Sequence, residues 1–133
     1  MVALTHAGRE LLRTAVVALD DAYQASTPAE RYVAAHIAAL RAGAALLATR
    51  ARPSRSSRIR SVWQMVPAIA PELGEWCAYF DMIGRRRVFV EIGREPVTQR
   101  QADDLVRDAE TFLEQIAGIL EVGLPIPSWR TAG

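Results

Sequence analysis

The chain has 133 residues, 50% hydrophobic and 23% charged, a balance typical of one globular domain and unlike that of a disordered chain. Its single cysteine, Cys77, excludes an intrachain disulfide and a zinc-finger framework, and it fits the reducing cytoplasm. The net charge of +1 gives no general attraction to nucleic acid, although every basic residue is an arginine. We expect one cytoplasmic domain over 1–133, with a core at about 5–121 and no membrane partner.

Apolar residues recur three and four positions apart along most of the chain, which predicts amphipathic α-helices. The first helix is predicted at about 5–25 and the second at about 28–50. Thr27, Pro28 and Glu30 form a capping signal at the start of the second helix. The predicted core stripe of the second helix contains Val33, Ile37, Leu40, Ala44 and Leu47, with the other alanines on its surface.

Three more helices are predicted in the second half of the chain. They cover about 57–66, 71–92 and 99–121. Pro67 is expected to end the first of them, Gly93 to cap the second, and Thr98 with Gln101 to begin the third. The residues expected inside are Trp63, Val66, Leu73, Trp76, Cys77, Phe80, Ile83, Val88, Leu105, Val106, Ala109, Phe112, Leu113, Ile116 and Leu120.

Amphipathic helices joined by short connections bury their stripes against one another in a bundle. The pattern therefore predicts an all-α fold, an up-and-down bundle of four to five helices. The segment 87–92 also fits a strand, but the stripe that continues from Leu73 favours a helix. The tail over 122–133 is predicted to be extended.

Arg31 and His36 form the sharpest candidate site, near the start of the second predicted helix. A histidine titrates near neutral pH and can move the proton of a ribose 2′-hydroxyl, while an arginine can stabilise charge that develops on a phosphate. Together they suit metal-independent cleavage of RNA. Five helical positions separate the side chains by about 140° around the axis, so a shared site favours two copies that meet across a dimer.

A structural role is the other interpretation of this pair. His36 lies on the flank of the predicted core stripe, where a histidine is often buried and hydrogen-bonded. Arg31 lies in the first helical turn, where it can pair with a carboxylate or remain solvated. Both interpretations stay open from the sequence.

Five arginines gather around the break that follows the second predicted helix. Arginines along a loop can follow a phosphate backbone, although a solvated connection is an equally simple explanation. The candidate nucleic-acid-binding residues are Arg50, Arg52, Arg55, Arg58 and Arg60.

Nothing in the sequence predicts a metal or a cofactor. The carboxylates at Asp103, Asp104 and Asp108 have no histidine nearby in sequence, and a solvated acidic face is the simpler explanation. There is no phosphate-binding loop, dinucleotide fingerprint or nucleophile motif.

Most of the chain, about 5–121, resembles the HEPN (higher eukaryotes and prokaryotes nucleotide-binding) superfamily, and in particular a small actinobacterial family of stand-alone HEPN domains. The resemblance is carried by Glu30 to Ala48, Arg60 to Trp76 and Gln101 to Phe112. It implies a helical bundle that is commonly dimeric.

Many HEPN proteins are metal-independent ribonucleases with an arginine-x4–6-histidine motif, which matches Arg31 and His36 here. Active members usually carry a polar residue after the arginine, where this chain has Tyr32. Other HEPN domains bind RNA, nucleotides or proteins without catalysis. The resemblance thus implies either an RNA-binding protein, with or without metal-independent cleavage of RNA at a composite homodimer site, or a non-catalytic module that docks a partner protein.

Overall fold

The computed structural model describes residues 3–51 and 61–124, and within these ranges the structure is all-α. The elements are α1 (His6–Gln24), α2 (Pro28–Arg50), α3 (Val62–Ile69), a short 3₁₀ turn η1 (Pro71–Leu73), α4 (Gly74–Glu91) and α5 (Gln99–Leu120). The prediction of an all-α bundle is confirmed. The beginning of the helix predicted at 57–66 and most of the predicted tail lie outside the described residues.

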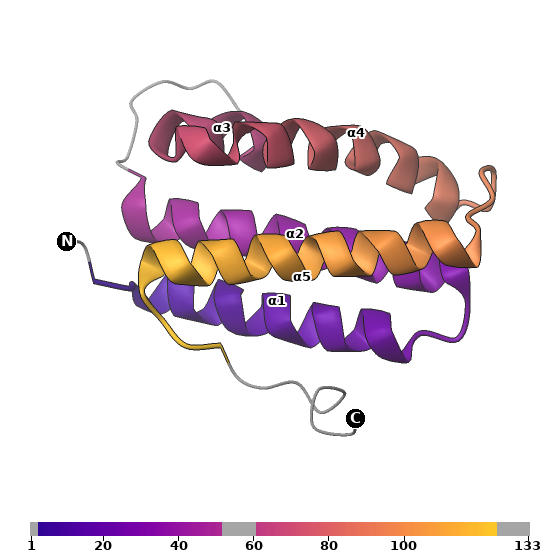
Figure 1. The fold of residues 1–133 in the computed structure, drawn as a ribbon, viewed down its shortest axis with the longest axis horizontal. Helices are drawn as coiled ribbons and strands as arrows, with labels where there is room; N and C mark the ends of the chain where they lie inside the picture. The colour runs from indigo at the N-terminus through magenta and orange to yellow at the C-terminus, as the bar shows by residue number, and fades with distance from the viewer. Residues whose placement is uncertain (1–2, 52–60, 125–133) are drawn as a thin grey trace.

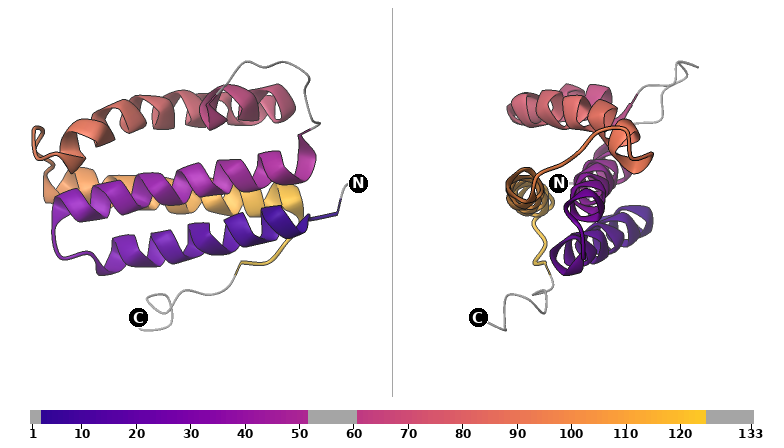
Figure 2. Two further views of the ribbon diagram at one scale, coloured as in Figure 1. Left: turned by 180° about the vertical axis from the view of Figure 1, so that it is seen from behind. Right: turned by 90° about the vertical axis from the view of Figure 1, so that its right-hand side faces the viewer.

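The long helices run up and down and enclose α2 (Figure 1). Seen along the bundle, α2 and α5 lie side by side, α1 lies on one side of α2, and α3 with α4 covers the other (Figure 2). In keeping with this position, α2 contacts α1, α3, α4 and α5. Side chains on α2 are therefore directed toward several different neighbours.

The capping signals have the predicted effect at the helix ends. The side chain of Thr27 accepts a hydrogen bond from the backbone N–H of Glu30, and Thr98 and Gln101 form a reciprocal capping box. Gly93 has φ +73° and follows the last turn of α4, where a left-handed residue closes the helix at little steric cost.

Three boundary predictions are corrected. Helix α3 begins at Val62 with Ser61 as its cap, and it continues through Pro67 to Ile69. The proline removes only its own N–H, and the backbone of Ala70 still donates to Val66. The helix predicted from residue 71 opens with the 3₁₀ turn η1, so α4 itself starts at Gly74.

The core prediction is correct for α5 but wrong for α2. All seven predicted α5 core residues are buried, whereas the face of α2 that faces its neighbours is lined by alanines. The side chains of Ala35, Ala38, Ala39, Ala42 and Ala45 are each 0% exposed. The predicted stripe through Val33 and Ile37 is only partly buried, because the buried face is turned by more than about a third of a turn from it.

Small residues on α2 explain this rotation. A helix that contacts four others needs close approach on several sides, and alanine allows it, whereas a larger side chain holds the axes apart. Val88 of α4 is a further correction: it was expected inside and is 55% exposed, while Val90 is buried.

By length and composition, α2 alone among the described helices could cross a membrane. Its most apolar window is, however, 56% buried inside the bundle, as in the core helix of a folded domain. The apolar character of α2 is thus accounted for by packing.

We predict that Ala39→Leu destabilises the domain by about 1–3 kcal/mol, because the extra methylenes have no space between α2 and its neighbours. Ala44→Leu is the matched control, since Ala44 belongs to the same helix but is only partly buried. Urea unfolding of both variants measures the difference. Equal losses of stability would contradict the central place of the alanine face.

Candidate functional site

Arg31 is held by the end of the preceding helix. Its Nε donates to the carbonyl of Ala22 at 2.9 Å, and Nη2 donates to the carbonyls of Tyr23 and Ala25, each at 3.3 Å. These are carbonyls of the last turn of α1, where a helix carries partial negative charge and lacks hydrogen-bond donors. The guanidinium therefore caps the C-terminus of α1.

The other end of the guanidinium joins α5. Nη1 of Arg31 pairs with Oδ1 of Asp103 at 2.7 Å, and this hydrogen bond lowers the pKa of the Asp103 carboxyl. A cavity of about 310 Å³ lies beside the pair, lined also by Tyr23, Val106 and Arg107. Arg31 thus ties α1, α2 and α5 together through four acceptors.

His36 points to another part of the bundle. Its side chain is only 3% exposed and lies against α4, with the ring centroid 5.9 Å from that of Trp63. Nε2 is 3.0 Å from the carbonyl of Phe80, and Nδ1 is 3.3 Å from Nη1 of Arg87. A carbonyl only accepts and a guanidinium only donates, so the ring is neutral, with its proton on Nε2.

Burial lowers the pKa of His36 to about 4, and the positive charge of Arg87 acts in the same direction. The carbonyl of Phe80 opposes the shift and is the second-largest influence. At neutral pH the imidazole is therefore uncharged, and each of its two nitrogens has a hydrogen-bond partner. Within one subunit, the imidazole is thus almost entirely shielded from solvent.

Gly84 allows α4 to lie this close to the imidazole. A β-carbon built on Gly84 would be 3.0 Å from both Cε1 and Nε2 of His36, closer than real β-carbon contacts normally are. Arg87 is itself held by Glu91, whose Oε1 lies 3.0 Å from Nε of Arg87. The sequence did not predict the contacts of Gly84, Arg87 and Asp103, because their partners are on helices distant in the chain.

The structure therefore does not bring the predicted catalytic pair together within one subunit. Arg31 contacts the end of α1 and α5, whereas His36 contacts α3 and α4. Their divergence agrees with the angle expected from five helical positions. The cavity beside Arg31 is not lined by His36.

Among the five arginines predicted to bind nucleic acid, only Arg50 lies in a described segment. Its Nη2 donates to the carbonyl of Ile119 at 2.8 Å, so it joins the ends of α2 and α5. Arg52, Arg55, Arg58 and Arg60 lie outside the described residues.

The carboxylates do not gather into a metal site. No group of three His, Cys, Asp or Glu side chains that could hold a metal ion occurs within residues 3–51 and 61–124. Asp104 pairs with Arg107 and Asp108 accepts a hydrogen bond from Tyr79. Burial raises the pKa of the Cys77 thiol to about 11, which keeps it protonated and unreactive.

The described residues also form an apolar surface, which the sequence did not predict. A groove of about 320 Å³ between the first half of α2 and the end of α4 is lined by Ala29, Glu30, Val33, Ala34, Ile37, Val90 and Glu91. In the last turns of α4, Val88, Phe89 and Ile92 are 55%, 52% and 61% exposed. We call the groove and these three residues together the α2–α4 apolar surface.

The chain is similar to a known protein family. A family model described as SAV_6107-like HEPN matches residues 22–117. This span includes Arg31, His36 and the α2–α4 apolar surface. Searches of curated proteins and of solved structures returned no match.

We predict that Arg31→Lys lowers the free energy of unfolding by about 1–3 kcal/mol, because an ammonium cannot satisfy three carbonyls and a carboxylate in one plane. Arg41→Lys is the control. Arg41 is exposed and makes one long hydrogen bond, at 3.4 Å, to the carbonyl of Thr14. Urea unfolding compares the two variants, and equal stability would contradict the capping role of Arg31.

We predict that the domain loses stability as the pH falls from about 6.5 to 4. The pKa of His36 is lowered from 6.5 to about 4 on folding, so in this range the unfolded chain binds a proton that the folded chain excludes. The loss approaches about 3 kcal/mol and levels off below the folded pKa.

The measurement is denaturant unfolding of wild type and His36→Gln at several pH values. Carboxylates titrate in both proteins, so the informative quantity is the difference between the two curves. We expect the variant to lack the loss assigned to His36. Parallel curves would show that the histidine is not held neutral.

Proposed function

This chain belongs to the SAV_6107-like HEPN family, and we propose that it is a non-catalytic HEPN domain that pairs with a second copy of itself through the α2–α4 apolar surface. The observation that carries the proposal is the position of Val33 and Ile37. The spacing of apolar residues predicts that both are buried, yet in a single subunit they are only partly buried and line a groove at the surface.

The size and composition of this surface support an interface. Folded monomers rarely present several large apolar side chains next to one another without a binding role. Val88, Phe89 and Ile92 are exposed at the end of the same helix whose Val90 and Glu91 line the groove. An apolar groove between two helices is suited to receive another helix.

The charges at the edge of the surface favour a second copy as the partner. Glu30 and Glu91 line the groove, and α4 also carries the exposed ion pair of Arg85 with Asp81, so both signs of charge occur on these helices. In a two-fold dimer one patch meets itself, so it must carry both signs to avoid like-charge contacts. The commonly dimeric nature of HEPN domains, implied by the resemblance, agrees with this choice.

The contacts of the predicted catalytic pair support the absence of catalysis. Cleavage of RNA would require a phosphate to replace the carbonyl and carboxylate partners of Arg31. It would also require His36 to leave a site in which it is 3% exposed and bound at both nitrogens. A second subunit could add groups beside Arg31, but it would not expose an imidazole enclosed between α2 and α4.

Light scattering coupled to size-exclusion chromatography tests the proposal. We expect the wild type to be a dimer and Phe89→Glu/Ile92→Glu to be a monomer with unchanged helical circular dichroism. Val17→Glu is the matched control, because Val17 is 46% exposed but belongs to α1. A monomeric wild type at high micromolar concentration would contradict the dimer.

Incubation with RNA in the presence of a chelator tests the non-catalytic half of the proposal. We expect no cleavage by the wild type. Cleavage that disappears in a folded His36→Gln variant would overturn this half and return His36 to the role of general acid and base. The dimer would remain a separate conclusion, since it depends on other residues.

A further inference from the structure

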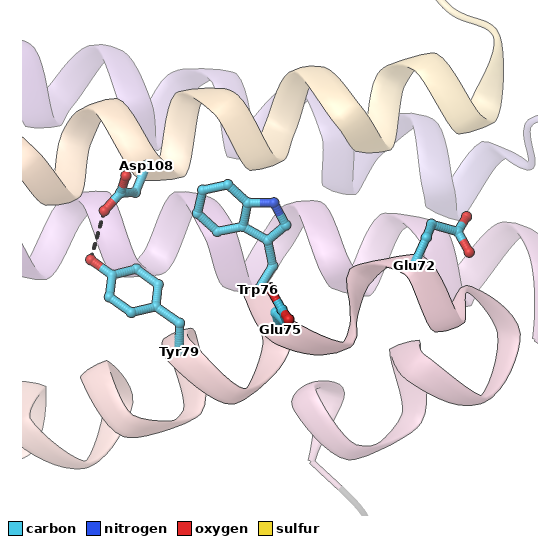
Figure 3. Close-up of a pocket in the computed structure, with 5 residues that line it drawn as sticks. All are labelled: Glu72, Glu75, Trp76, Tyr79 and Asp108. Atoms are coloured by element: carbon cyan, nitrogen blue, oxygen red, sulfur yellow. Dashed lines mark hydrogen bonds between the residues drawn. The ribbon is translucent and has the colours of Figure 1, made fainter.

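A second cavity lies between the start of α4 and the middle of α5, away from the α2–α4 apolar surface. Its volume is about 440 Å³, and it is lined by Glu72, Glu75, Trp76, Tyr79 and Asp108. Figure 3 shows the indole and the phenol beside each other, with Asp108 near the phenol and Glu72 beyond the indole. The volume is in the range of small-molecule sites.

The aromatic wall of this cavity is fixed by the core. Trp76 stacks on the buried Phe80, with centroids 5.7 Å apart and planes at 15°, and meets Tyr79 edge-on at 6.2 Å. The Tyr79 hydroxyl donates to Oδ2 of Asp108 at 2.7 Å. Burial raises the pKa of Tyr79, so the phenol remains a neutral donor. The wall therefore offers a flat π-surface in a set orientation.

The polar side of the cavity is entirely acidic. No basic residue lines it, and neither Glu72 nor Glu75 forms an ion pair with any residue in the described ranges. Exposed carboxylates alone would be an ordinary solvated surface. Here the carboxylates border a concave wall of aromatic rings. Carboxylates and aromatic rings together form a recognition site for an organic cation.

We propose that this cavity binds the guanidinium group of a small organic cation. A guanidinium is flat, is weakly hydrated, stacks on aromatic rings and donates hydrogen bonds in its own plane to carboxylates. It would lie on Trp76 and direct its N–H groups toward Glu75 and Asp108, with Glu72 attracting the charge. Tyr79 occupies one oxygen of Asp108 and fixes the carboxylate for the other to accept.

This proposal does not depend on the proposed dimer or on the absence of catalysis. The residues of the cavity belong to η1, α4 and α5, and none of them belongs to the α2–α4 apolar surface. The two proposals can therefore fail separately.

Titration followed by two-dimensional NMR tests the site with two guanidinium probes, agmatine and the peptide acetyl-Gly-Arg-Gly-amide. The citrulline version of the peptide is the matched negative probe, because it replaces the cation with a neutral urea of the same shape. We expect the indole N–H signal of Trp76, assigned with Trp76→Phe, to shift with agmatine and not with the citrulline peptide. A shift with the arginine peptide as well would identify side-chain guanidinium as a second source of the ligand.

Glu72→Gln/Glu75→Gln should weaken agmatine binding about tenfold or more, as expected for loss of charge-assisted contacts. Both residues are exposed, so the variant is expected to fold, and thermal unfolding checks this. Asp21→Asn, an exposed substitution on α1, is the control for loss of a negative charge. Equal shifts with the citrulline peptide, equal affinity in all variants, or no shift at millimolar agmatine would overturn the proposal.

Discussion

Close packing around α2 is the constraint on which the rest of the structure depends. One helix contacts the four others, and alanines that are 0% exposed make this approach possible. Each flank of α2 is consequently assigned to a different neighbour. A side chain's position on the turn decides whether it reaches α1 and α5, α3 and α4, or the surface.

The arginine-x4-histidine pair illustrates this effect. Arg31 is on the side of α2 that reaches the end of α1 and α5, and His36 is on the side that reaches α3 and α4. Each residue then satisfies groups that the fold itself leaves open: carbonyls at a helix end and a buried carbonyl on α4. Residue types suited to phosphate chemistry are here suited to joining helices, because the same donors serve both purposes.

The sequence was sufficient for the fold class, the five helices and most of their ends, since periodicity and capping are local properties. The α5 core followed from its stripe in the same way. The core prediction was wrong for α2, because hydropathy ranks Val33 and Ile37 above alanine for burial. Hydropathy takes no account of how many other helices pack closely against one helix. Partners such as Asp103 for Arg31 and Arg87 for His36 depend on tertiary packing and could not be found from spacing. The cavity lined by aromatic and acidic residues could not be predicted for the same reason, since Asp108 is far along the chain from Trp76.

A single position on α4, Gly84, determines how closely this helix approaches His36. Because the side chain of Gly84 is a single hydrogen atom, α4 lies close enough to α2 for the Phe80 carbonyl to form a hydrogen bond with the imidazole. A β-carbon at this position would require the ring or the helix to give way by a few tenths of an ångström, which would disturb the hydrogen bond between His36 and Phe80. The surroundings of the histidine in this chain thus depend on a residue outside the arginine–histidine motif, at a position on α4 where the side chain is a single hydrogen atom.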